Sequence, residues 1–350
     1  MRKQTLNVAV VGLGWWGRII AATAMRESRL IKLVRLTDSS AAAFAATTEF
    51  AHIPFSTRFE DVLEDKGVEA VILVTPHGAH EAQVAAAAAA GKHVFCEKPL
   101  GLTRASVERS IRACQRAAVV LGVGHERRFE TPVEDLRALV LDGHLGVPLQ
   151  VEANFSHDRF VSLPKSNWRL CAEEAPAAGM TGPGIHLLDL AVAFLGEARH
   201  VVAHVATLAT DFPAGDTLGF LASHRSGATS YVAATLATPF ISRFALYGSK
   251  GWVEIRDKAH VEKPEGWWVQ QQLAGQPLAR KEYSPMNAVL RNLEAFATAA
   301  LGRAAYPIDS AALLATASAM EAVLQSARAG GAIVHPVLAQ AADLSRSATK

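Results

Sequence analysis

Two side chains in this sequence, Lys98 and His186, stand where acid–base chemistry could take place. Lys98 lies in "HVFCEKP", where it follows a predicted buried strand, sits beside Glu97 and precedes Pro99, which fixes the turn. A lysine held partly away from water can have a lowered pKa and can polarise or deprotonate a substrate hydroxyl. The alternative is a solvated Glu–Lys pair at the end of a strand.

His186 lies in "TGPGIHLLDL", just after two glycines and at the entry of a predicted helix. It is either a catalyst or a polar residue that the backbone satisfies at the helix entry. Four positions earlier stands Gly182, where an acid–base site could have placed a carboxylate. Asp189, three residues after His186, can share a helix face with it. Alternatively, Asp189 is a first-turn carboxylate favoured by the helix dipole.

The elements that must position Lys98 alternate between strand and helix from residue 6 to about residue 123. Short, continuously apolar runs between helical segments are typical of a doubly wound parallel sheet. The expected strands are 6–12, 31–38, 69–75, 92–99 and 118–124, and the expected helices are 15–25, 41–50, 58–65, 80–91 and 104–117.

The pattern changes after about residue 124, where longer runs of alternating residues are separated by turn residues. This spacing predicts an antiparallel sheet. The expected strands are 149–157, 198–209, 218–227, 229–237, 240–251 and 251–257, and the expected helices are 133–143, 185–195, 287–301 and 310–329. We therefore expect an α/β protein with a Rossmann domain at 1–123 and an α+β domain at 124–350.

The turn "VGLGWWG" joins the first strand to the first helix and carries a G-x-G-x-x-G pattern. In this context the first glycine permits a tight turn, the second admits a pyrophosphate, and the third lets the helix pack on the strand. Free N–H groups at the helix start would bind the phosphates. The alternative is a turn that only closes a βα unit. The residues expected to bind the dinucleotide here are Gly12, Leu13, Gly14, Trp15, Trp16 and Gly17.

Asp38 ends the second predicted strand, about 20 residues past the glycine motif, where the ribose is usually recognised. A carboxylate there accepts hydrogen bonds from both ribose hydroxyls and repels a 2′-phosphate, and no arginine follows it. We therefore expect NAD rather than NADP as the cofactor. Asp38 could equally cap the next helix, with or without that role.

Composition excludes several classes of function. Thirty-five basic and 33 acidic side chains give a net charge of +2, which is too balanced to predict a nucleic-acid or membrane partner. No stretch of about 18 apolar residues predicts a membrane span. The three cysteines lie far apart, without metal-type spacing. We expect a soluble cytoplasmic protein with reduced thiols and no metal.

The chain resembles the Gfo/Idh/MocA family of glucose–fructose oxidoreductase-like and inositol dehydrogenase-like enzymes. The motifs that carry the resemblance are, in order, the glycine turn, "TPHGAH", "CEKP", "GHERRF", "NWR", "GMTGPGIHLLD" and "LYGSKGWVEI". They extend over nearly the whole chain. The glycine turn is common to many folds, whereas the E-K-P and G-I-H-x-x-D patterns are more discriminating.

The resemblance implies an NAD(P)-dependent oxidoreductase that moves a hydride between nicotinamide and a hydroxyl or ketone of a sugar, cyclitol or related polyol. Lys98 and His186 would be catalytic, with His186 acting as a general base in oxidation, because histidine titrates near neutral pH. The two groups would come from separate domains and meet at the nicotinamide, and the Lys98–Pro99 bond could be cis. Further expected cofactor contacts are Thr75, Pro76, His80, Glu97, Lys98, Arg127, Trp168 and Arg169, and the expected substrate contacts are Lys98, Arg127, His186 and Asp189.

Gly182 departs from this family pattern, which usually has aspartate four residues before the histidine. Another group or water must then assist, or the substrate differs. Asp158, Glu173, Glu126 and Asp189 are the candidate substitutes. The alternative function is a dinucleotide-sensing or regulatory relative that has lost turnover. The family's open sheet commonly makes dimer contacts, so we expect a homodimer or homotetramer formed through it.

Overall fold

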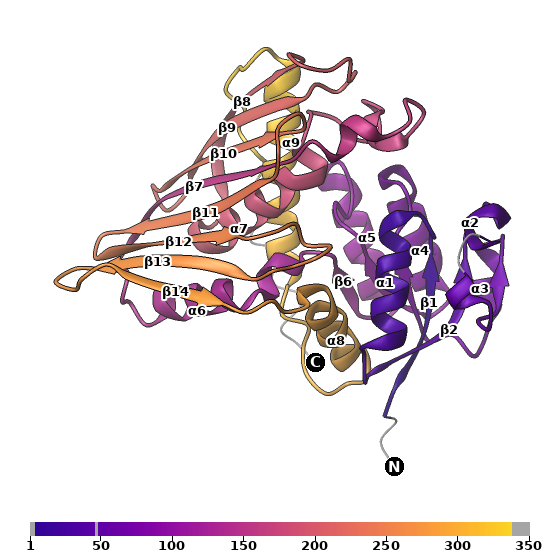
Figure 1. Cartoon of the computed structure of the whole chain (residues 1–350). Coiled ribbons are helices and arrows are strands. Elements are labelled where there is room, and N and C mark those ends of the chain that lie inside the picture. The colour runs from indigo at the N-terminus through magenta and orange to yellow at the C-terminus, as the bar shows by residue number, and fades with distance from the viewer. Residues whose placement is uncertain (1–3, 46–47, 338–350) are drawn as a thin grey trace. The chain divides into compact units, whose positions relative to one another are not determined.

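The computed structural model describes residues 4–45 and 48–337 and divides the chain into two compact units (Figure 1). The first unit comprises Met1–Glu126 and Asn287–Ser310, and the second comprises Arg127–Met286 and Ala311–Lys350. The expected helix 41–50 includes residues 46 and 47, which lie outside the described residues. The end of the expected second domain, 338–350, lies outside them too.

The described part of the first unit contains a parallel sheet of six strands in the order β3-β2-β1-β4-β5-β6. The order reverses between β1 and β4, which is typical of a dinucleotide-binding Rossmann fold. The strands are β1 Leu6–Val11, β2 Ile31–Thr37, β3 Phe55–Ser56, β4 Ala70–Leu73, β5 His93–Cys96 and β6 Leu121–Val123.

Helices pack on both faces of this sheet, so its central strands have almost no solvent contact. All four residues of β4 are buried, which explains why its sequence is continuously apolar. Thr103 caps α5 by accepting a hydrogen bond from the Ser106 N–H. The helices are α1 Trp15–Arg26, α2 Ala41–Ala45, α3 Glu60–Glu64, α4 His80–Ala89, α5 Arg104–Arg116 and α8 Ala288–Ala300, with 3₁₀ turns at Thr48–Phe50, His77–Ala79 and Glu126–Phe129.

Helix α8 belongs to the first unit although its residues follow the whole second sheet in sequence. The Phe296 ring packs edge-on against Phe95 of β5, with 5.6 Å between the ring centroids. The Asn292 side chain donates a hydrogen bond to the Val123 carbonyl at 2.9 Å. A side chain at Gly122 would begin 2.9 Å from both rings, so β6 needs a glycine there. One closing helix thus completes the first core.

The described part of the second unit contains a sheet of eight strands in the order β14-β13-β12-β11-β7-β10-β9-β8. Only β7 and β10 pair in parallel, and the other neighbours are antiparallel. The strands are β7 Pro148–Ser156, β8 Ala198–Ala206, β9 Thr217–His224, β10 Thr229–Thr235, β11 Ile241–Gly248, β12 Gly251–Asp257, β13 Trp267–Leu273 and β14 Ala279–Tyr283.

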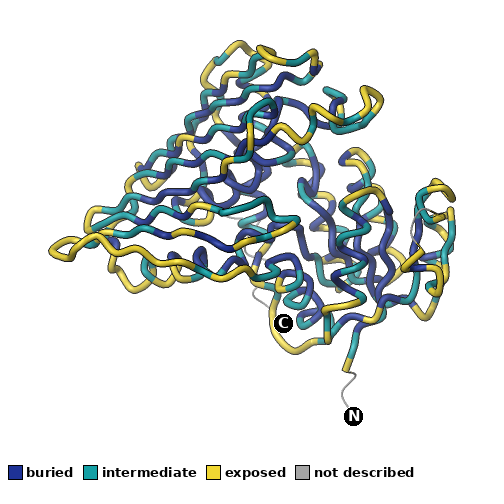
Figure 2. Tube along the Cα trace, viewed as in Figure 1, coloured by how far each residue is buried: buried dark blue, intermediate teal, exposed yellow. Residues whose placement is uncertain are grey.

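Three helices, α6 (Thr131–Leu141), α7 (Ile185–Leu195) and α9 (Ser310–Arg328), contribute to the core on one face of the second sheet (Figures 1 and 2). Burial alternates along β9, whose every second residue points into this core. The other face carries Tyr231, Ile241 and Trp268, which are exposed by 43%, 44% and 53%. This face of the sheet is therefore open.

The predicted fold class is confirmed: a parallel Rossmann sheet is followed by a large, mostly antiparallel open sheet. Three strands were not predicted, namely β3, β13 and β14. β13 reads WWVQQQL and β14 reads ARKEY, and four of the five β14 residues are exposed. An exposed edge strand needs no apolar alternation, so the pattern that indicates a half-buried strand is missing there.

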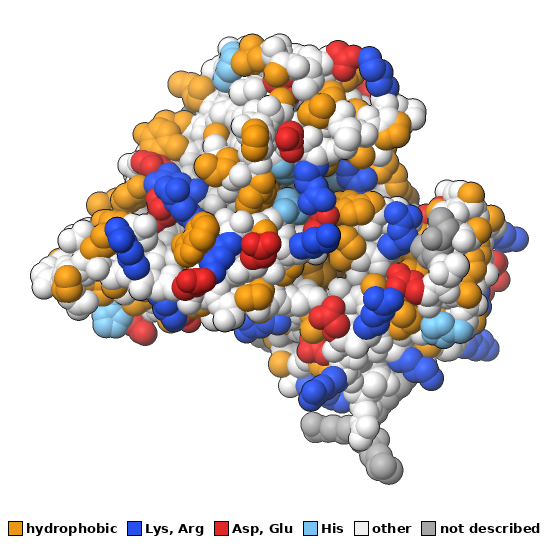
Figure 3. Space-filling model, viewed as in Figure 1, with side chains coloured by type: hydrophobic (Ala, Val, Ile, Leu, Met, Phe, Trp, Pro, Cys, Tyr) orange, Lys and Arg blue, Asp and Glu red, His pale blue; other side chains and the backbone are white. Residues whose placement is uncertain are grey.

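No helix in the described ranges combines the length and apolar character that a membrane span requires. On the face shown in Figure 3, basic and acidic side chains are interspersed. They form no continuous basic area on that face, in agreement with the balanced charge of the sequence.

Asp216 organises the loop between β8 and β9. Its side chain is fully buried and accepts hydrogen bonds from the backbone N–H groups of Leu208, Ala209 and Thr210 at 2.8–3.1 Å. Burial opposes ionisation of the carboxyl, but these backbone donors and the Thr217 hydroxyl outweigh it and lower the pKa of Asp216 to about 2.

We expect Asp216→Asn to lower the free energy of unfolding at neutral pH by about 2 kcal/mol. The NH₂ group of the asparagine would face backbone N–H groups, which cannot accept its hydrogen bonds. A carboxyl group whose pKa is lower in the folded state than in the unfolded state stabilises the fold at pH values above the unfolded-state pKa. This contribution is lost as the pH falls through the folded-state pKa. The difference from wild type should therefore shrink between about pH 4 and pH 2. Urea unfolding at neutral and acid pH measures it. Asp211→Asn, at an exposed carboxylate in the same loop, is the control and should leave the unfolding midpoint close to that of wild type, because solvent screens an exposed charge. Equal losses in the two variants would contradict the prediction.

Candidate active site

The turn between β1 and α1 is built so that two of its glycines leave no room for a side chain. A Cβ atom on Gly12, whose φ is +96°, would lie 2.6 Å from the Val74 carbonyl oxygen, and one on Gly17 would lie 1.9 Å from the Gly12 carbonyl oxygen. A Cβ atom on Gly14, in contrast, would meet nothing within 4 Å. Two positions thus bring helix and strand together, and the third leaves the open approach that a pyrophosphate needs.

Asp38 reaches back to this turn from the end of β2. One carboxylate oxygen accepts a hydrogen bond from the Leu13 N–H at 2.6 Å, and the other accepts one from the Ser40 N–H at 2.8 Å. The second bond closes a turn with Ser40, the residue before α2, and the first places the carboxylate beside the glycine turn. Trp15, in the first turn of α1, is 40% exposed, and the centroid of its ring lies 5.4 Å from that of the Trp16 ring.

The segments after β4 and β5 follow neighbouring strands, so they lie at the same edge of the parallel sheet. Thr75 donates a hydrogen bond from its hydroxyl to the Gln83 side chain at 2.5 Å. Pro76 precedes the 3₁₀ turn that leads into α4. Ligands of open α/β sheets bind at this carboxyl edge.

Glu97 and Lys98 follow β5 at this edge. The Lys98–Pro99 peptide is cis, as the resemblance suggested. Glu97 is 6% exposed, and its carboxylate accepts a hydrogen bond from the Lys98 backbone N–H at 3.2 Å. Both of its oxygens lie 2.6 Å from where a Cβ on Gly124 would begin, so glycine is required there. Lys98 is half-buried, unlike the lysine of a fully solvated Glu–Lys pair.

His80 begins α4 and is completely buried. Its Nδ1 lies 2.8 Å from the Pro99 carbonyl oxygen, and its Nε2 lies 3.0 Å from the Thr75 carbonyl oxygen. The ring therefore bridges the two segments that follow β4 and β5.

His186, in the second unit, stands in the first turn of α7 and is 6% exposed. A π-helical turn, Met180–Gly184, leads into α7 and contains Pro183. Within that turn a Cβ atom on Gly182 would lie 3.7 Å from the Phe160 ring, which is an ordinary contact distance. The position that holds aspartate in the family pattern thus has room for a first side-chain atom.

The ring of Phe155, at the end of β7, is the centre of a cluster that sequence reasoning missed. His157, His186 and His260 place their rings 6.0, 6.2 and 5.8 Å from it. The signal that could have revealed part of this cluster is the i, i+2 spacing of Phe155, near the end of β7, and His157, directly after it, both of which are buried.

Two histidines of this cluster differ in their electrostatic surroundings. Burial lowers the pKa of His157 to about 4, assisted by the charges of His260 and Arg159, so its ring is neutral at physiological pH. His260 Nδ1 lies 3.2 Å from the Glu262 carboxylate. Burial opposes ionisation of Glu262, but hydrogen bonds and charges from His260 and Arg159 outweigh it and lower its pKa.

Arg127 is 5% exposed and lies against the same aromatic ring, with its guanidinium carbon 4.6 Å from the Phe155 centroid. It donates hydrogen bonds to the Asp257 carboxylate at 2.5 Å and to the Ser242 hydroxyl at 2.9 Å. The structure therefore places Arg127 in the histidine cluster, with an acidic partner for its charge.

Asp189 forms a buried ion pair within the second unit. Its carboxylate accepts two hydrogen bonds from the Arg128 guanidinium at 2.6 and 2.7 Å, and a third from the Thr316 hydroxyl at 3.0 Å. A carboxylate held by a bidentate arginine is fixed in position and strongly favours its ionised form. The ion pair ties α7 to the 3₁₀ turn that contains Arg128, and the Thr316 hydrogen bond ties α7 to α9.

The remaining predicted residues make other contacts or belong to the first unit. Arg169 stacks over the Trp168 ring at 4.3 Å, and both belong to the 3₁₀ turn Trp168–Leu170. Asp158 and Glu173 are exposed. Glu126 is 4% exposed and belongs to the first unit.

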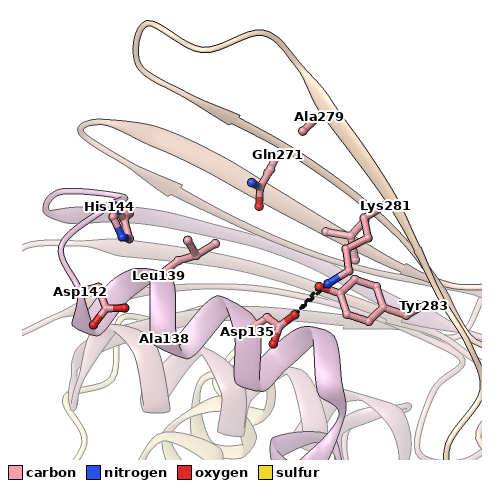
Figure 4. A pocket seen from close by; sticks show the side chains of 10 residues that line it. Asp135, Ala138, Leu139, Asp142, His144, Gln271, Ala279, Lys281 and Tyr283 are labelled. Carbon is pink, nitrogen blue, oxygen red and sulfur yellow. Dashed lines mark hydrogen bonds and ion pairs between the residues drawn. The ribbon is translucent and has the colours of Figure 1, made fainter.

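A cavity of about 410 Å³ opens in the second unit between α6 and the hairpin of β13 and β14 (Figure 4). At one end Tyr283 donates a hydrogen bond to Asp135 at 2.5 Å, and Lys281 pairs with the same carboxylate at 3.2 Å. None of the predicted catalytic or cofactor-binding residues lines this cavity, so it is not our candidate for the reaction.

Two family models match the chain. One is described as an oxidoreductase family with an NAD-binding Rossmann fold and matches residues 6–125. The other is described as the GFO/IDH/MocA C-terminal domain and matches residues 133–254. Together they take in well over half of the chain.

Individual relatives agree with these models. A 1,5-anhydro-D-fructose reductase from Ensifer adhaerens is 31% identical over 186 residues, which is 51% of this chain and 53% of that protein. A D-xylose 1-dehydrogenase (NADP(+)) from Haloferax volcanii is 25% identical over 325 residues, 90% of this chain and 98% of the relative. The first of these matches spans only about half the length of the curated relative.

Among solved structures, an aldose–aldose oxidoreductase from Caulobacter crescentus, complexed with glycerol, is 27% identical. It superposes with a TM-score of 0.84 and covers 95% of this chain and all of that structure. With the two matched domains and the geometry of its glycine turn, the chain belongs to the Gfo/Idh/MocA oxidoreductase family.

Proposed function

We propose that the protein is an NAD(P)-dependent oxidoreductase acting on a hydroxyl or ketone group of a sugar, cyclitol or related polyol. The observation that carries this proposal is the glycine turn of the first unit, where Gly12 and Gly17 exclude side chains and Gly14 leaves open space. The relatives named above act, by their names, on sugars or sugar derivatives, which supports the substrate class.

For the cofactor we propose NAD in preference to NADP. The Asp38 carboxylate lies against the Leu13 amide, so its negative charge stands beside the dinucleotide turn. A ribose with free hydroxyls can donate hydrogen bonds to it, whereas a 2′-phosphate would be repelled. The other proposed contacts of the first unit are the glycine-turn residues with Trp15 and Trp16, then Thr75, Pro76, Glu97 and Lys98. Those of the second unit are Arg127, Trp168 and Arg169.

For the chemistry we propose that Lys98 and His186 carry the protons. A bound nicotinamide would supply or accept the hydride. Lys98, half-buried at the carboxyl edge of the sheet, would bind and polarise the substrate oxygen. His186 would take the proton from that oxygen in oxidation and return it in reduction.

Asp189 is proposed as a substrate contact or as the residue that orients His186. Its pairing with Arg128 favours an orienting role over proton transfer, because a doubly hydrogen-bonded carboxylate is a weak base. In place of the aspartate of the family pattern, His157 and His260 supply titratable groups around Phe155.

We further propose that the protein forms a homodimer or homotetramer through the open face of the second sheet. Tyr231, Ile241 and Trp268 are large apolar side chains exposed on that face. Light scattering coupled to gel filtration tests this, and Trp268→Glu should reduce the measured mass if the face is the interface.

Removing either proton carrier should abolish turnover. The purified protein is incubated with NAD and a panel of sugars, polyols and sugar acids, and reduced nicotinamide is followed by its absorbance. We expect Lys98→Ala and His186→Ala to lower kcat by about 10²- to 10⁴-fold, which is the usual contribution of general acid–base catalysis. Lys66→Ala and His204→Ala remove an exposed lysine and an exposed histidine from the same two units, and they should leave kcat unchanged.

Replacing the charge at residue 38 should change cofactor preference. We expect Asp38→Asn to lower the ratio of the NADP to the NAD dissociation constant by about tenfold or more, because it removes a negative charge near the 2′ position. Asp65→Asn, which removes a carboxylate just before β4 at the opposite edge of the sheet, is the control. Equal wild-type affinities for NAD and NADP would remove the role assigned to Asp38.

The Gly182→Asp variant distinguishes two hypotheses, that the protein is an active oxidoreductase or that it is a relative that has lost turnover. Because a Cβ atom at this position would meet the Phe160 ring only at an ordinary contact distance, the variant should fold with a Tm within about 2 °C of wild type. Gly179→Ala provides the contrast, since its Cβ would lie 2.8 Å from that of Ala234. We expect turnover in the wild type already. A wild type that binds NAD without turnover, beside a Gly182→Asp variant that gains it, would instead identify a relative that has lost catalysis.

A further inference from the structure

His80 makes an unusual pair of contacts for a buried histidine. The side chain has no solvent exposure, and both ring nitrogens face backbone carbonyl oxygens, that of Pro99 at 2.8 Å and that of Thr75 at 3.0 Å. Carbonyl oxygens only accept hydrogen bonds. The ring can therefore hold both of them only when both nitrogens carry a hydrogen, which is the imidazolium form. Hydrogen bonds from a charged donor are shorter and stronger than neutral ones, which reduces the cost of burying that charge.

The two carbonyls belong to different segments of the first unit. Thr75 lies in the segment that leaves β4, and Pro99 in the segment that leaves β5, and these strands are neighbours with Leu73 opposite Cys96. The ring thus bridges two adjacent chain segments at the carboxyl edge of the sheet. Pro99 is the residue directly after Lys98, so the second hydrogen bond fixes the backbone next to the lysine.

We propose that His80 is a positioning residue: its ring clamps the Thr75 and Pro99 backbones together and thereby sets where the Lys98 side chain begins. This inference rests on the proposed function, since the role of Lys98 comes from it. It goes beyond the expected role of His80 as a cofactor contact, because both nitrogens are engaged with the backbone. Small displacements of a reacting group cost much in rate, about 10²-fold for 1 Å, so a loosened clamp should slow catalysis.

The test replaces His80 with glutamine, whose amide donates from a single nitrogen and can hold one carbonyl but not both. We expect His80→Gln to lower kcat by about tenfold or more. The NAD dissociation constant should change by less than about threefold, because the glycine turn is untouched. His93→Gln is the matched control: His93 lies at the other end of β5, and its Nδ1 accepts a hydrogen bond from the Val120 N–H. That variant should lose comparable thermal stability and keep its kcat.

A double-mutant cycle distinguishes positioning from general loss of structure. If His80 acts through Lys98, then His80→Gln should lower the residual rate of a Lys98→Ala enzyme by less than about twofold. A tenfold loss in both backgrounds would overturn the proposal, as would an unchanged kcat in His80→Gln.

Two readouts do not require turnover, so they separate this inference from the proposed function. The rate at which an amine-selective reagent labels Lys98, relative to the exposed Lys66 and measured by mass spectrometry, should change by about threefold or more in His80→Gln. In the wild-type protein, ¹⁵N NMR of histidine-labelled material should show a hydrogen on both ring nitrogens of His80 at neutral pH. Unchanged labelling of Lys98, or a His80 ring with one protonated nitrogen, would overturn the clamp even if the protein proves to be an active oxidoreductase.

Discussion

The carbonyl oxygen of Gly12 lies 1.9 Å from the point where a side chain on residue 17 would begin, so α1 can approach β1 only because that residue is a glycine. This close approach brings the first free N–H groups of α1 to the end of the sheet, where the Leu13 amide also meets the Asp38 carboxylate. The segments that carry Thr75 and Lys98 leave the same edge. One steric constraint therefore gathers, around the ends of four parallel strands, the groups that we propose to bind phosphate and ribose and to transfer protons.

The second unit arranges its polar groups around an aromatic ring instead of a backbone turn. The guanidinium of Arg127 and three imidazoles contact Phe155, while Asp257 pairs with Arg127 and Glu262 pairs with Arg159 beside His260. Burial keeps His157 neutral. His186 thus shares the Phe155 ring with two further imidazoles, and Gly182 provides no carboxylate four residues before it.

Sequence reasoning was most successful where one physical requirement decides the residue types. The parallel strands are continuously apolar because helices cover both faces, and the glycine turn is recognisable because close packing excludes side chains. It missed β14, whose residues face solvent, and it missed Phe155 and His260. Those two rings come together because β7 pairs with β11, β11 pairs with β12, and His260 follows β12. No local pattern records which strands of an antiparallel sheet become neighbours. The two contacts of His80 were equally hidden, since they depend on where two carbonyls point.

The packing of α8 on the first sheet has a consequence for how the chain is made. The core under β5 and β6 contains Phe296, and the Val123 carbonyl is held by Asn292 and Tyr306, all encoded after the entire second sheet. A ribosome therefore releases the first 126 residues long before the helix that closes their core exists. Until roughly residue 306 has left the exit tunnel, Phe95 and Gly122 remain uncovered, so the nucleotide-binding unit matures only after the whole second sheet has been synthesised.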